Sequence, residues 1–406
     1  MKKGWPTKTL AEVCQIKPPK SEARETVSAS SLVSFLPMED MGIDVKLVQA
    51  TQTKPLSAVV GSYTYFADGD VLLAKITPCF ENGKLGIADG LKNGIGFGSS
   101  EYFVFRPDPT VSKEWLYYFL SRDTFRVEGA ARMSGAVGHK RVSKEFIEDY
   151  PIPVPPLAEQ QRIVVLLDEA FEGLATAKAN AEKNLQNARA LFESHLQSVF
   201  TQRGPGWVEK NLGDLCEVFA DGDWVESKDQ SSEGIRLIQT GNVGQGVFKD
   251  RADKARYISE ATFKRLRCTE IFDGDCLISR LPDPVGRSCI LPDTGERMIT
   301  AVDCTIVRFD QKQLLSKFFN HYSQSDDYIR TVAKECTGTT RNRISRSNLA
   351  LTTIPVPPIA EQKRLASEFD SMREETQRLA SLYELKHAAL EALKKSLLHQ
   401  AFTGEL

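Results

Sequence analysis

Two long stretches of the chain carry apolar or small residues at alternating three- and four-residue steps, the spacing of one face of a coiled-coil helix. The first stretch, residues 157–201, contains no proline, and its apolar positions are 163, 167, 170, 174, 177, 181, 185, 188, 192, 196 and 199. The second covers residues 360–401, with Leu365, Phe369, Met372, Thr376, Leu379, Tyr383, Leu390, Leu393, Leu397 and Ala401 on its apolar face. We expect two helices of roughly 42–45 residues, each about 65 Å long at 1.5 Å per residue.

Each of these helices needs a partner, because an isolated amphipathic helix would leave its apolar face in water. The other long helix is the obvious partner, and a pseudo-twofold arrangement would make the two antiparallel with a globular domain at each end. His387 and Lys394 interrupt the second apolar face, so more polar packing is expected there. The alternative is that each helix packs on its own domain, but about 65 Å outruns a domain whose radius of gyration is near 15 Å.

The rest of the chain has the pattern of mixed α/β domains. Residues 59–66 and 71–76 are rich in β-formers and are joined by Asp68-Gly69, a turn signal. Residues 102–105 predict a further strand. Ser112 precedes an apolar run and predicts the N-cap of a short helix over 113–120. In the second half, Asp273-Gly274 again comes before a predicted strand, residues 276–279.

The chain also repeats itself, at an offset of 202 residues. Segment 152–168 recurs as 354–370 with ten of its seventeen positions identical, and both copies read Ile-Pro-Val-Pro-Pro, one aliphatic residue, then Ala-Glu-Gln-x-Arg. The interiors slip, since Asp68-Gly69-Asp70 matches Asp273-Gly274-Asp275 at an offset of 205. A repeat of half the chain length indicates a tandem duplication of one domain and one helix.

The expected fold class is therefore α+β. Two tandem mixed α/β domains, residues 1–152 and 203–353, are separated by two long antiparallel coiled-coil helices in residues 153–202 and 354–406. The two halves are expected to be related by pseudo-twofold symmetry. Proline cannot lie inside a helix, so the Pro-Pro pairs mark where each domain ends and each helix begins.

Composition is that of an ordinary globular protein, with 41% hydrophobic and 26% charged residues. No apolar run approaches the ~20 residues of a membrane span. The N-terminal residues lack the apolar stretch of a signal peptide. We therefore expect a cytoplasmic protein with no membrane partner.

No set of residues with the spacing of a catalytic, cofactor or metal site is found. The eight cysteines form no Cys-x-x-Cys pair, which argues against zinc. Val154 and Leu157 flank Pro155-Pro156, whereas a DNA methyltransferase motif needs Asp or Asn before the prolines and an aromatic residue after them. The glycine-rich segment 93–98 lacks the helix that a phosphate site needs and is interpreted as a turn. The aspartates at 68, 70, 273 and 275 are interpreted as turn residues. The prediction is a protein with no catalytic residues, metal or cofactor.

Nucleic-acid binding would have to come from local clusters, because the net charge is −2. One cluster follows each Asp-Gly-Asp turn, and a second precedes each Ile-Pro-Val-Pro-Pro motif. Arginine on glycine-containing loops can read guanine, Asn or Gln can read adenine, and Lys or Thr can bind phosphate. The candidate DNA-binding residues are Lys75, Thr77, Asn82, Lys84, His139, Lys140, Arg141, Arg236, Gln239, Asn242, Arg280, Arg287, Thr339, Thr340, Arg341, Arg343 and Arg346.

Two further points bear on these clusters. The loop 337–346 is the sharpest candidate, because no acidic residue occurs from Thr337 to Leu351. The second half adds further basic residues at Lys249, Arg251, Lys254 and Arg256. For any single residue the alternative is an ordinary solvated polar loop.

The layout resembles the specificity (S) subunit of type I restriction–modification systems, over nearly the whole chain. The resemblance is carried by the repeated Ile-Pro-Val-Pro-Pro-[Leu/Ile]-Ala-Glu-Gln-x-Arg, the Gly-Asp turns at 69–70 and 274–275, segment 33–40 and the two long helices. It implies that each domain is a target recognition domain for one half of an asymmetric bipartite DNA site. It also implies that the helices set the spacer and dock two methyltransferase subunits, that restriction subunits join them, and that the chain itself is not catalytic.

The resemblance also suggests where the partners bind. Candidate partner-docking residues lie at the start of each long helix: Glu159, Gln160, Arg162, Glu361, Gln362 and Arg364. The alternative function is a non-catalytic coiled-coil scaffold or adaptor whose terminal domains bind protein or glycan. Salt-dependent binding to mixed-sequence DNA would separate the two, since phosphate contacts give a steep negative slope.

Overall fold

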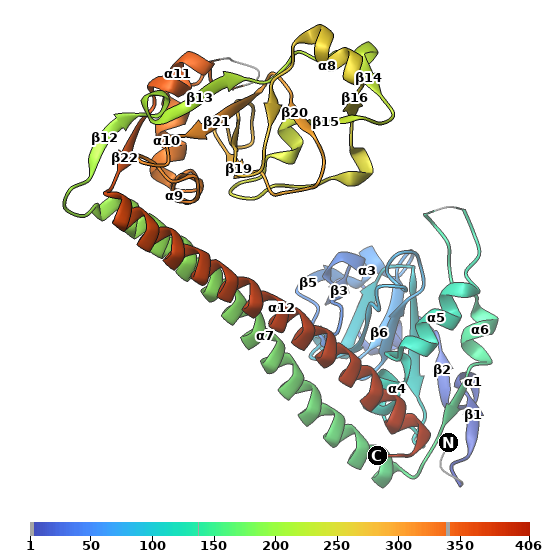
Figure 1. Ribbon diagram of the computed structural model, residues 1–406. Coiled ribbons are helices and arrows are strands. Elements are labelled where there is room, and N and C mark those ends of the chain that lie inside the picture. The colour runs from blue at the N-terminus through green and yellow to red at the C-terminus, as the bar shows by residue number, and fades with distance from the viewer. Residues whose placement is uncertain (1–3, 137, 338–341) are drawn as a thin grey trace. The chain divides into compact units, whose positions relative to one another are not determined.

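The computed structural model describes residues 4–136, 138–337 and 342–406. The chain forms two compact units, Met1–Ala181 with Glu384–Leu406, and Glu182–Tyr383. Each unit combines one mixed α/β domain with a part of both long helices, α7 (Leu157–Gln202) and α12 (Ile359–Thr403) (Figure 1). Thr339, Thr340 and Arg341 lie outside the described residues.

The first domain is built on two sheets with the strand orders β2-β10-β7-β8-β4 and β5-β3-β9-β6, and on a two-stranded ribbon of β1 and β11. Its strands are β1 (Thr7–Thr9), β2 (Cys14–Ile16), β3 (Leu32–Leu36), β4 (Leu47–Val48), β5 (Gln52–Pro55), β6 (Thr64–Ala67), β7 (Val71–Ala74), β8 (Leu85–Ala88), β9 (Ile95–Gly98), β10 (Tyr102–Pro107) and β11 (Pro151–Pro153). Its helices are α1 (Leu10–Val13), α2 (Ser21–Thr26), α3 (Leu56–Val59), α4 (Lys113–Leu120), α5 (Asp123–Ala131) and α6 (Lys144–Glu148), with 3-10 turns η1 (Met38–Asp40) and η2 (Lys92–Gly94).

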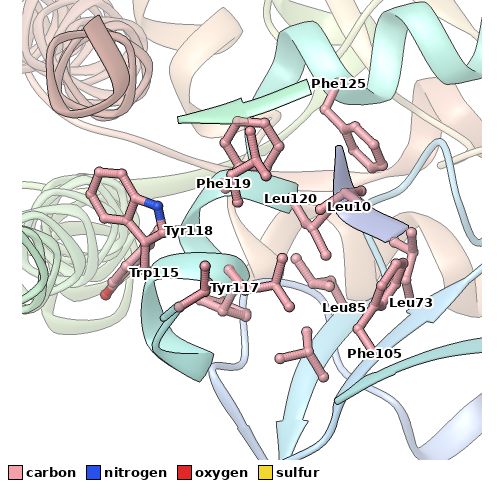
Figure 2. Packing of buried hydrophobic residues seen from close by; sticks show 14 of the residues in the cluster. Leu10, Leu73, Leu85, Phe105, Trp115, Tyr117, Tyr118, Phe119, Leu120 and Phe125 are labelled. Carbon is pink, nitrogen blue, oxygen red and sulfur yellow. The ribbon is translucent and has the colours of Figure 1, made fainter. Parts of the chain in front are cut away.

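The helix predicted over 113–120 is confirmed as α4. Ser112 is its N-cap, because its Oγ accepts a hydrogen bond from the Trp115 backbone N–H at 3.1 Å. Trp115 is fully buried, and its Nε1 donates to the Pro153 carbonyl at 3.0 Å. Figure 2 shows α4 packed against side chains from the strands, including Leu73, Leu85 and Phe105. The helix therefore ties the sheet to the proline motif that opens α7.

The strand predicted over 59–66 is wrong in its first half. Leu56 and Val59 belong to the short helix α3 and are buried on its inner side, and the strand β6 starts only at Thr64. The turn at Asp68-Gly69 is present, but β6 and β7 lie in different sheets, so it connects two sheets and closes no hairpin. Apolar residues that pack in a helical turn have the same local composition as a strand, which is why pattern alone misassigned them.

The interpretation of 93–98 as a turn is also wrong, since only residues 92–94 turn and Ile95–Gly98 form β9 in the middle of a sheet. A Cβ on Gly96 would lie 2.1 Å from the Phe66 ring, and one on Gly98 would lie 2.4 Å from the Leu36 carbonyl oxygen. These glycines are required because neighbouring groups occupy the space of a side chain.

The second domain has sheets of order β13-β21-β18-β19 and β14-β16-β15-β20-β17, with a ribbon of β12 and β22. Its strands are β12 (Val208–Asn211), β13 (Cys216–Asp221), β14 (Gln230–Ser231), β15 (Ile235–Ile238), β16 (Tyr257–Ile258), β17 (Glu270–Ile271), β18 (Cys276–Ser279), β19 (Ser288–Ile290), β20 (Met298–Thr300), β21 (Cys304–Phe309) and β22 (Thr353–Val356). Its helices are α8 (Glu260–Leu266), α9 (Ser316–Tyr322), α10 (Asp326–Lys334) and α11 (Arg346–Leu351), with 3-10 turns η3 (Leu212–Leu215), η4 (Ser227–Asp229), η5 (Thr240–Asn242) and η6 (Ala252–Lys254).

Both long helices are confirmed, and within each unit they run antiparallel. In the first unit Lys178 Nζ lies 3.1 Å from Glu391 Oε1, and Arg162 donates to the Leu406 carbonyl at 2.8 Å. In the second unit His195 Nε2 lies 2.8 Å from Glu368 Oε1. All eleven apolar positions predicted on the first helix are buried or half-buried.

The apolar face predicted for the second helix needs one correction. Leu393 is 48% exposed, whereas Leu397 and Leu398 turn inward. The polar interruption expected at Lys394 is present, since its Nζ lies 2.8 Å from Asp44 Oδ1 and 5.7 Å from the centre of the Phe171 ring. Over the described residues, no helix combines the length and the apolar character that crossing a bilayer requires.

Candidate nucleic-acid interface

Three charged side chains meet at the ends of two neighbouring strands of the main sheet in the first unit, where β7 ends and β10 begins. Arg141 forms a bidentate pair with Glu101, with Nε to Oε2 at 2.9 Å and Nη2 to Oε1 at 2.8 Å. Lys75 Nζ lies 4.0 Å from the same carboxylate and donates to the Ser100 carbonyl at 2.9 Å. We call these three residues the first triad, Lys75–Glu101–Arg141.

The second unit has an equivalent cluster at the corresponding place, where β18 ends and β21 begins, but its loop arginine makes a single ion-pair contact with the acid instead of a bidentate pair. Arg343 Nη2 lies 2.7 Å from Asp303 Oδ1. Arg280 donates to the Val302 carbonyl at 2.6 Å, with its Nη2 3.9 Å from Asp303 and 3.3 Å from Asp221. We call these residues the second triad, Arg280–Asp303–Arg343.

The two triads are equivalent in sequence as well as in structure. Their acidic members are 202 residues apart, as are their loop arginines, whereas Lys75 and Arg280 are 205 apart, the same slip as the Asp-Gly-Asp turns before them. Each triad has the order basic, acidic, basic, and so has a net charge of about +1 at neutral pH. Both halves of the duplicated chain therefore carry a basic–acidic–basic cluster at the same place in the domain.

The electrostatics of the first triad follow from its pairing. The hydrogen bonds from Arg141 hold the pKa of the Glu101 carboxyl below its ordinary value, and Glu101 raises the pKa of Arg141. Burial lowers the pKa of the Lys75 ammonium, although Glu101 opposes that shift. All three groups stay charged at neutral pH, so the edge presents a fixed pattern of charge.

Each triad lies at the base of a loop that carries further candidates. In the first unit, Ser134 and Arg141 exchange backbone hydrogen bonds of 3.0 and 2.8 Å and close the loop between α5 and α6, which leaves the body of the unit in Figure 1. His139 and Lys140 are exposed on this loop. In the second unit Thr337 and Arg343 close the equivalent loop, and Arg346 begins α11 with its Nε 4.0 Å from Asp221.

The cluster after the first Asp-Gly-Asp turn is more structural than the sequence suggested. Thr77 Oγ1 donates to the Lys140 carbonyl at 3.2 Å, so it supports the loop from beneath. Lys84 Nζ donates to the Met38 carbonyl at 2.6 Å. Asn82 is exposed and remains available. Of these three, only Asn82 presents its side chain to solvent without a partner among the described residues.

Four candidates of the second half are buried, so their placement on polar surface loops is wrong. Arg236 is 4% exposed and pairs with Asp250 and with Glu296, the latter at 2.7 Å. Arg280 is 4% exposed, and Arg287 is 8% exposed. The Arg287 guanidinium donates to four carbonyls, those of Val243, Leu281, Pro284 and Thr240, at 2.6–3.1 Å.

Asn242 is the fourth, and Gln239 beside it is half-buried. Asn242 donates to the carbonyls of Lys249 and Asp250 at 2.8 and 3.0 Å, and its Oδ1 accepts from the Gln239 backbone N–H at 3.0 Å. Because these groups are used inside the domain, Arg236, Asn242 and Arg287 are left out of the candidate surface, and Arg280 belongs to it only as the buried member of the second triad.

These buried residues position a basic loop that the site prediction passed over. Arg236 and Asn242 both bind Asp250, and this holds the segment 249–256 in place. Lys249, Arg251, Lys254 and Arg256 on that segment are all exposed, and none forms an ion pair within the described part of the chain. In the sequence these basic residues alternate with Asp250 and Asp253, and Asp250 is paired with the buried Arg236. That alternation was the signal that could have identified the loop.

The helix starts divide the candidate partner-docking residues into two kinds. Gln160 and Gln362 are 0% exposed, which contradicts their role in docking. Gln160 Oε1 accepts from the Ser112 N–H at 2.9 Å, while its Nε2 donates to the Thr110 and Pro155 carbonyls at 2.8 Å. Gln362 makes the same three bonds to Leu315, Gln313 and Pro357 at 2.8–2.9 Å. Both glutamines join a helix to its domain.

The charged members of the motif lie outside. Arg162 pairs bidentately with Glu159 at 2.8 and 3.0 Å, and Arg364 with Glu361 at 2.9 and 2.8 Å. The arginine side chains are 47% and 58% exposed. These repeated ion pairs remain candidates for contact with a partner.

The aspartates of the Asp-Gly-Asp turns have a structural role. Asp70 and Asp275 are 1% and 3% exposed and pair bidentately with Arg106 and Arg308 at 2.7–2.9 Å. Each also accepts a backbone N–H three residues earlier, at 2.8 and 3.0 Å, which confirms the interpretation as turn residues. Among the described residues, no three His, Cys, Asp or Glu side chains come together as metal ligands would.

Comparison with known proteins matches two stretches of this chain, residues 2–185 and 205–385, to the family described as the type I restriction modification DNA specificity domain. The EcoAI type I restriction enzyme specificity subunit of Escherichia coli is 34% identical over 254 residues, which are 62% of this chain and 42% of that protein. The EcoKI specificity subunit of Escherichia coli K12 is 27% identical over 360 residues, 82% of this chain and 76% of that one. The chain thus aligns with less than half of the EcoAI subunit's length.

Two solved structures share the fold. A chain from a study of assembly and conformational transition in the type I R-M system superposes with a TM-score of 0.77 at 21% identity, covering 100% of this chain and 99% of that one. The HsdS subunit from Thermoanaerobacter tengcongensis superposes with a TM-score of 0.71 at 20% identity, covering 100% and 98%. At these identities the likeness concerns the fold alone.

Proposed function

The chain belongs to the type I restriction modification DNA specificity domain family, and from that premise we propose that it is the DNA-specificity subunit of a type I restriction–modification complex. Each domain would read one half of a bipartite double-stranded DNA site. The observation that carries the proposal is the duplicated triad, because a basic–acidic–basic cluster occurs at the ends of equivalent strands in both domains.

The two half-sites are expected to differ. The triads are shared, but the residues around them are not: the first loop carries His139 and Lys140, whereas the second domain adds the basic loop 249–256. Base contacts determine sequence and phosphate contacts determine position. Shared triads combined with different loops in the two domains favour an asymmetric site.

The partners proposed for the helices are two methyltransferase subunits, joined in the full complex by restriction subunits. Two copies of one partner need two equivalent surfaces. The exposed pairs Glu159–Arg162 and Glu361–Arg364 supply them at the starts of α7 and α12. In this proposal the chain contributes recognition and assembly but no catalytic group or cofactor.

The test is methylome sequencing of host cells with and without this gene. The expected result is one bipartite methylated sequence that disappears with the gene, while the purified chain alone methylates nothing. Methyl transfer by the isolated chain, or an unchanged methylome, would contradict the proposal. A scaffold that binds protein or glycan would instead show no steep salt dependence when titrated with mixed-sequence DNA.

A further inference from the structure

We propose that the carboxylates of the repeated triads, Glu101 and Asp303, set DNA specificity by holding the neighbouring arginine in the orientation that reads a base edge. In this role they are positioning residues that act through Arg141 and Arg343. The inference rests on the proposed function, because it takes Arg141 and Arg343 to contact DNA and states why each would contact a base rather than a phosphate.

Backbone hydrogen bonds hold the main chain of each arginine in place without help from the carboxylate. Arg141 exchanges two backbone hydrogen bonds with Ser134, and the next residue, Val142, donates to the Lys75 carbonyl at 3.0 Å. In the second domain Arg343 exchanges two with Thr337, and Ile344 donates to the Arg280 carbonyl at 3.3 Å. The carboxylate therefore determines where the guanidinium points and not where the loop lies.

The Arg141 guanidinium keeps two N–H groups that its neighbours do not use. A guanidinium has five N–H groups. Arg141 uses two on Glu101 and one, from Nη1, on the His139 carbonyl at 3.1 Å. One N–H on Nη1 and one on Nη2 have no acceptor among the described residues. Two neighbouring donors held at fixed orientation suit the paired acceptors of a guanine edge, whereas a freely rotating arginine pairs readily with any phosphate.

An arginine–carboxylate ion pair occurs at this place in both domains with different acids, bidentate between Arg141 and Glu101 and through Nη2 alone between Arg343 and Asp303. The arginine side chains are 46% and 48% exposed, and their partners Glu101 and Asp303 are 22% and 28% exposed. A surface ion pair of this kind adds little stability. Its retention in both domains, beside loops that otherwise differ, points to a requirement for orientation rather than for folding.

A carboxylate this close to the interface should also repel the DNA backbone. It therefore weakens binding to DNA of any sequence while it strengthens discrimination. Replacing it by an amide of the same shape separates the two effects, because the charge is lost while the volume is kept. The variants are Glu101→Gln and Asp303→Asn, and the matched controls are Glu101→Asp and Asp303→Glu, each of which installs the acid that the other domain uses.

The experiment uses the full chain co-purified with its methyltransferase subunit. Binding to a mixed-sequence duplex is titrated against salt, and a random duplex library is selected and sequenced. For each amide variant we expect tighter binding to mixed duplex and a salt slope steeper by up to about 0.9 per added phosphate contact. Preference at one base pair of one half-site should fall by about 5- to 150-fold, the discrimination of one bidentate contact. The acid-swap controls should retain most of that preference.

The results that would overturn the inference are distinct from those that would overturn the function. Unchanged base preference in both amide variants contradicts it. So does a loss of preference across a whole half-site together with weaker mixed-duplex binding, because that pattern reports a misfolded loop. If the unaltered complex enriches no sequence and shows no salt dependence, the proposed DNA-specificity function itself is wrong.

Discussion

The two buried glutamines show how a single residue can join two elements. Each makes three hydrogen bonds to backbone groups at the point where a domain passes into a long helix. An unsatisfied buried polar group costs about 1–3 kcal/mol. Gln160→Leu is therefore expected to destabilise the first unit by roughly 2–5 kcal/mol. Gln161→Leu, at the adjacent exposed position, is the control and should be near neutral in the same chemical-denaturation measurement.

Asp223 gives a prediction in pH. Burial raises the pKa of its carboxyl to about 6, although a hydrogen bond from the Thr269 N–H opposes the shift. The ordinary value in an unfolded chain is about 3.9. Above pH 6 the carboxyl is ionised in both states and its burial costs stability. Between about pH 6 and 4 the folded state binds the extra proton and becomes relatively more stable.

Asp223→Asn is therefore expected to raise the melting temperature of the second unit at pH 8. The difference should shrink as the pH falls through 6 and vanish near pH 4, where Asp223 is protonated in folded and unfolded chains alike. Scanning calorimetry across this range measures it. A constant difference at all pH values would mean that the carboxylate charge is not its cause.

What the sequence could predict at this scale depended on whether a residue acts locally. The Ser112 cap and the Asp70 turn needed only neighbours three residues away, and both predictions are confirmed. Arg287 binds the carbonyls of Val243 and Thr240, 44 and 47 residues away, and Asn242 binds carbonyls across a loop, seven and eight residues away. No local pattern separates a buried arginine from one that faces solvent, so these two could not be told from surface residues.

At the scale of elements, the basic loop 249–256 has the charge and exposure of a phosphate-binding segment. The double variant Lys249→Ala with Arg251→Ala is expected to reduce affinity for any duplex and to lower the salt slope by about 0.9 for each lost phosphate contact. Base preference should change little. The control is Arg378→Ala, which removes one exposed positive charge from α12, where it pairs with Glu375.

The measurement for this loop is the same salt titration with mixed-sequence and selected duplexes. Equal affinity of the variant and the unaltered chain for DNA would show that the loop does not contact DNA. A large change in base preference with an unchanged slope would instead make Lys249 or Arg251 a reader of bases.

The long helices were the most predictable elements and the interior strands the least. Eleven regularly spaced positions over α7 leave little doubt about period, and all face inward. β6 and β9 are four residues each, and the two glycines of β9, Gly96 against the Phe66 ring and Gly98 against the Leu36 carbonyl, resemble a turn in sequence. Whether a short segment forms a strand depends on the neighbouring strands with which it can pair, and those come from elsewhere in the domain.

At the scale of the whole molecule, the first unit is made from two pieces of chain, and the core of each unit includes the last turns of a long helix. The core of the first unit takes in Leu398, Ala401 and Phe402 from the end of α12, and that of the second takes in Leu196 and Phe200 from the end of α7. The Phe402 ring packs at a tilt against Trp115 with ring centres 4.3 Å apart, and the ring centres of Phe200 and Phe318 are 5.7 Å apart. Phe402 completes the first core and Phe200 the second, and these two equivalent residues are 202 positions apart in the chain.

This composition predicts that equivalent substitutions act on different units. Phe402→Ala should destabilise the first unit by about 3–5 kcal/mol, the cost of emptying a buried phenylalanine site, and Phe200→Ala should do the same to the second. Hydrogen exchange should show α4 losing protection in the first variant and α9 in the second. Leu191→Ala, at a position 66% exposed on α7, is the control. Loss of protection in both units from either variant would contradict separate cores, because it would mean that the chain unfolds as one cooperative body.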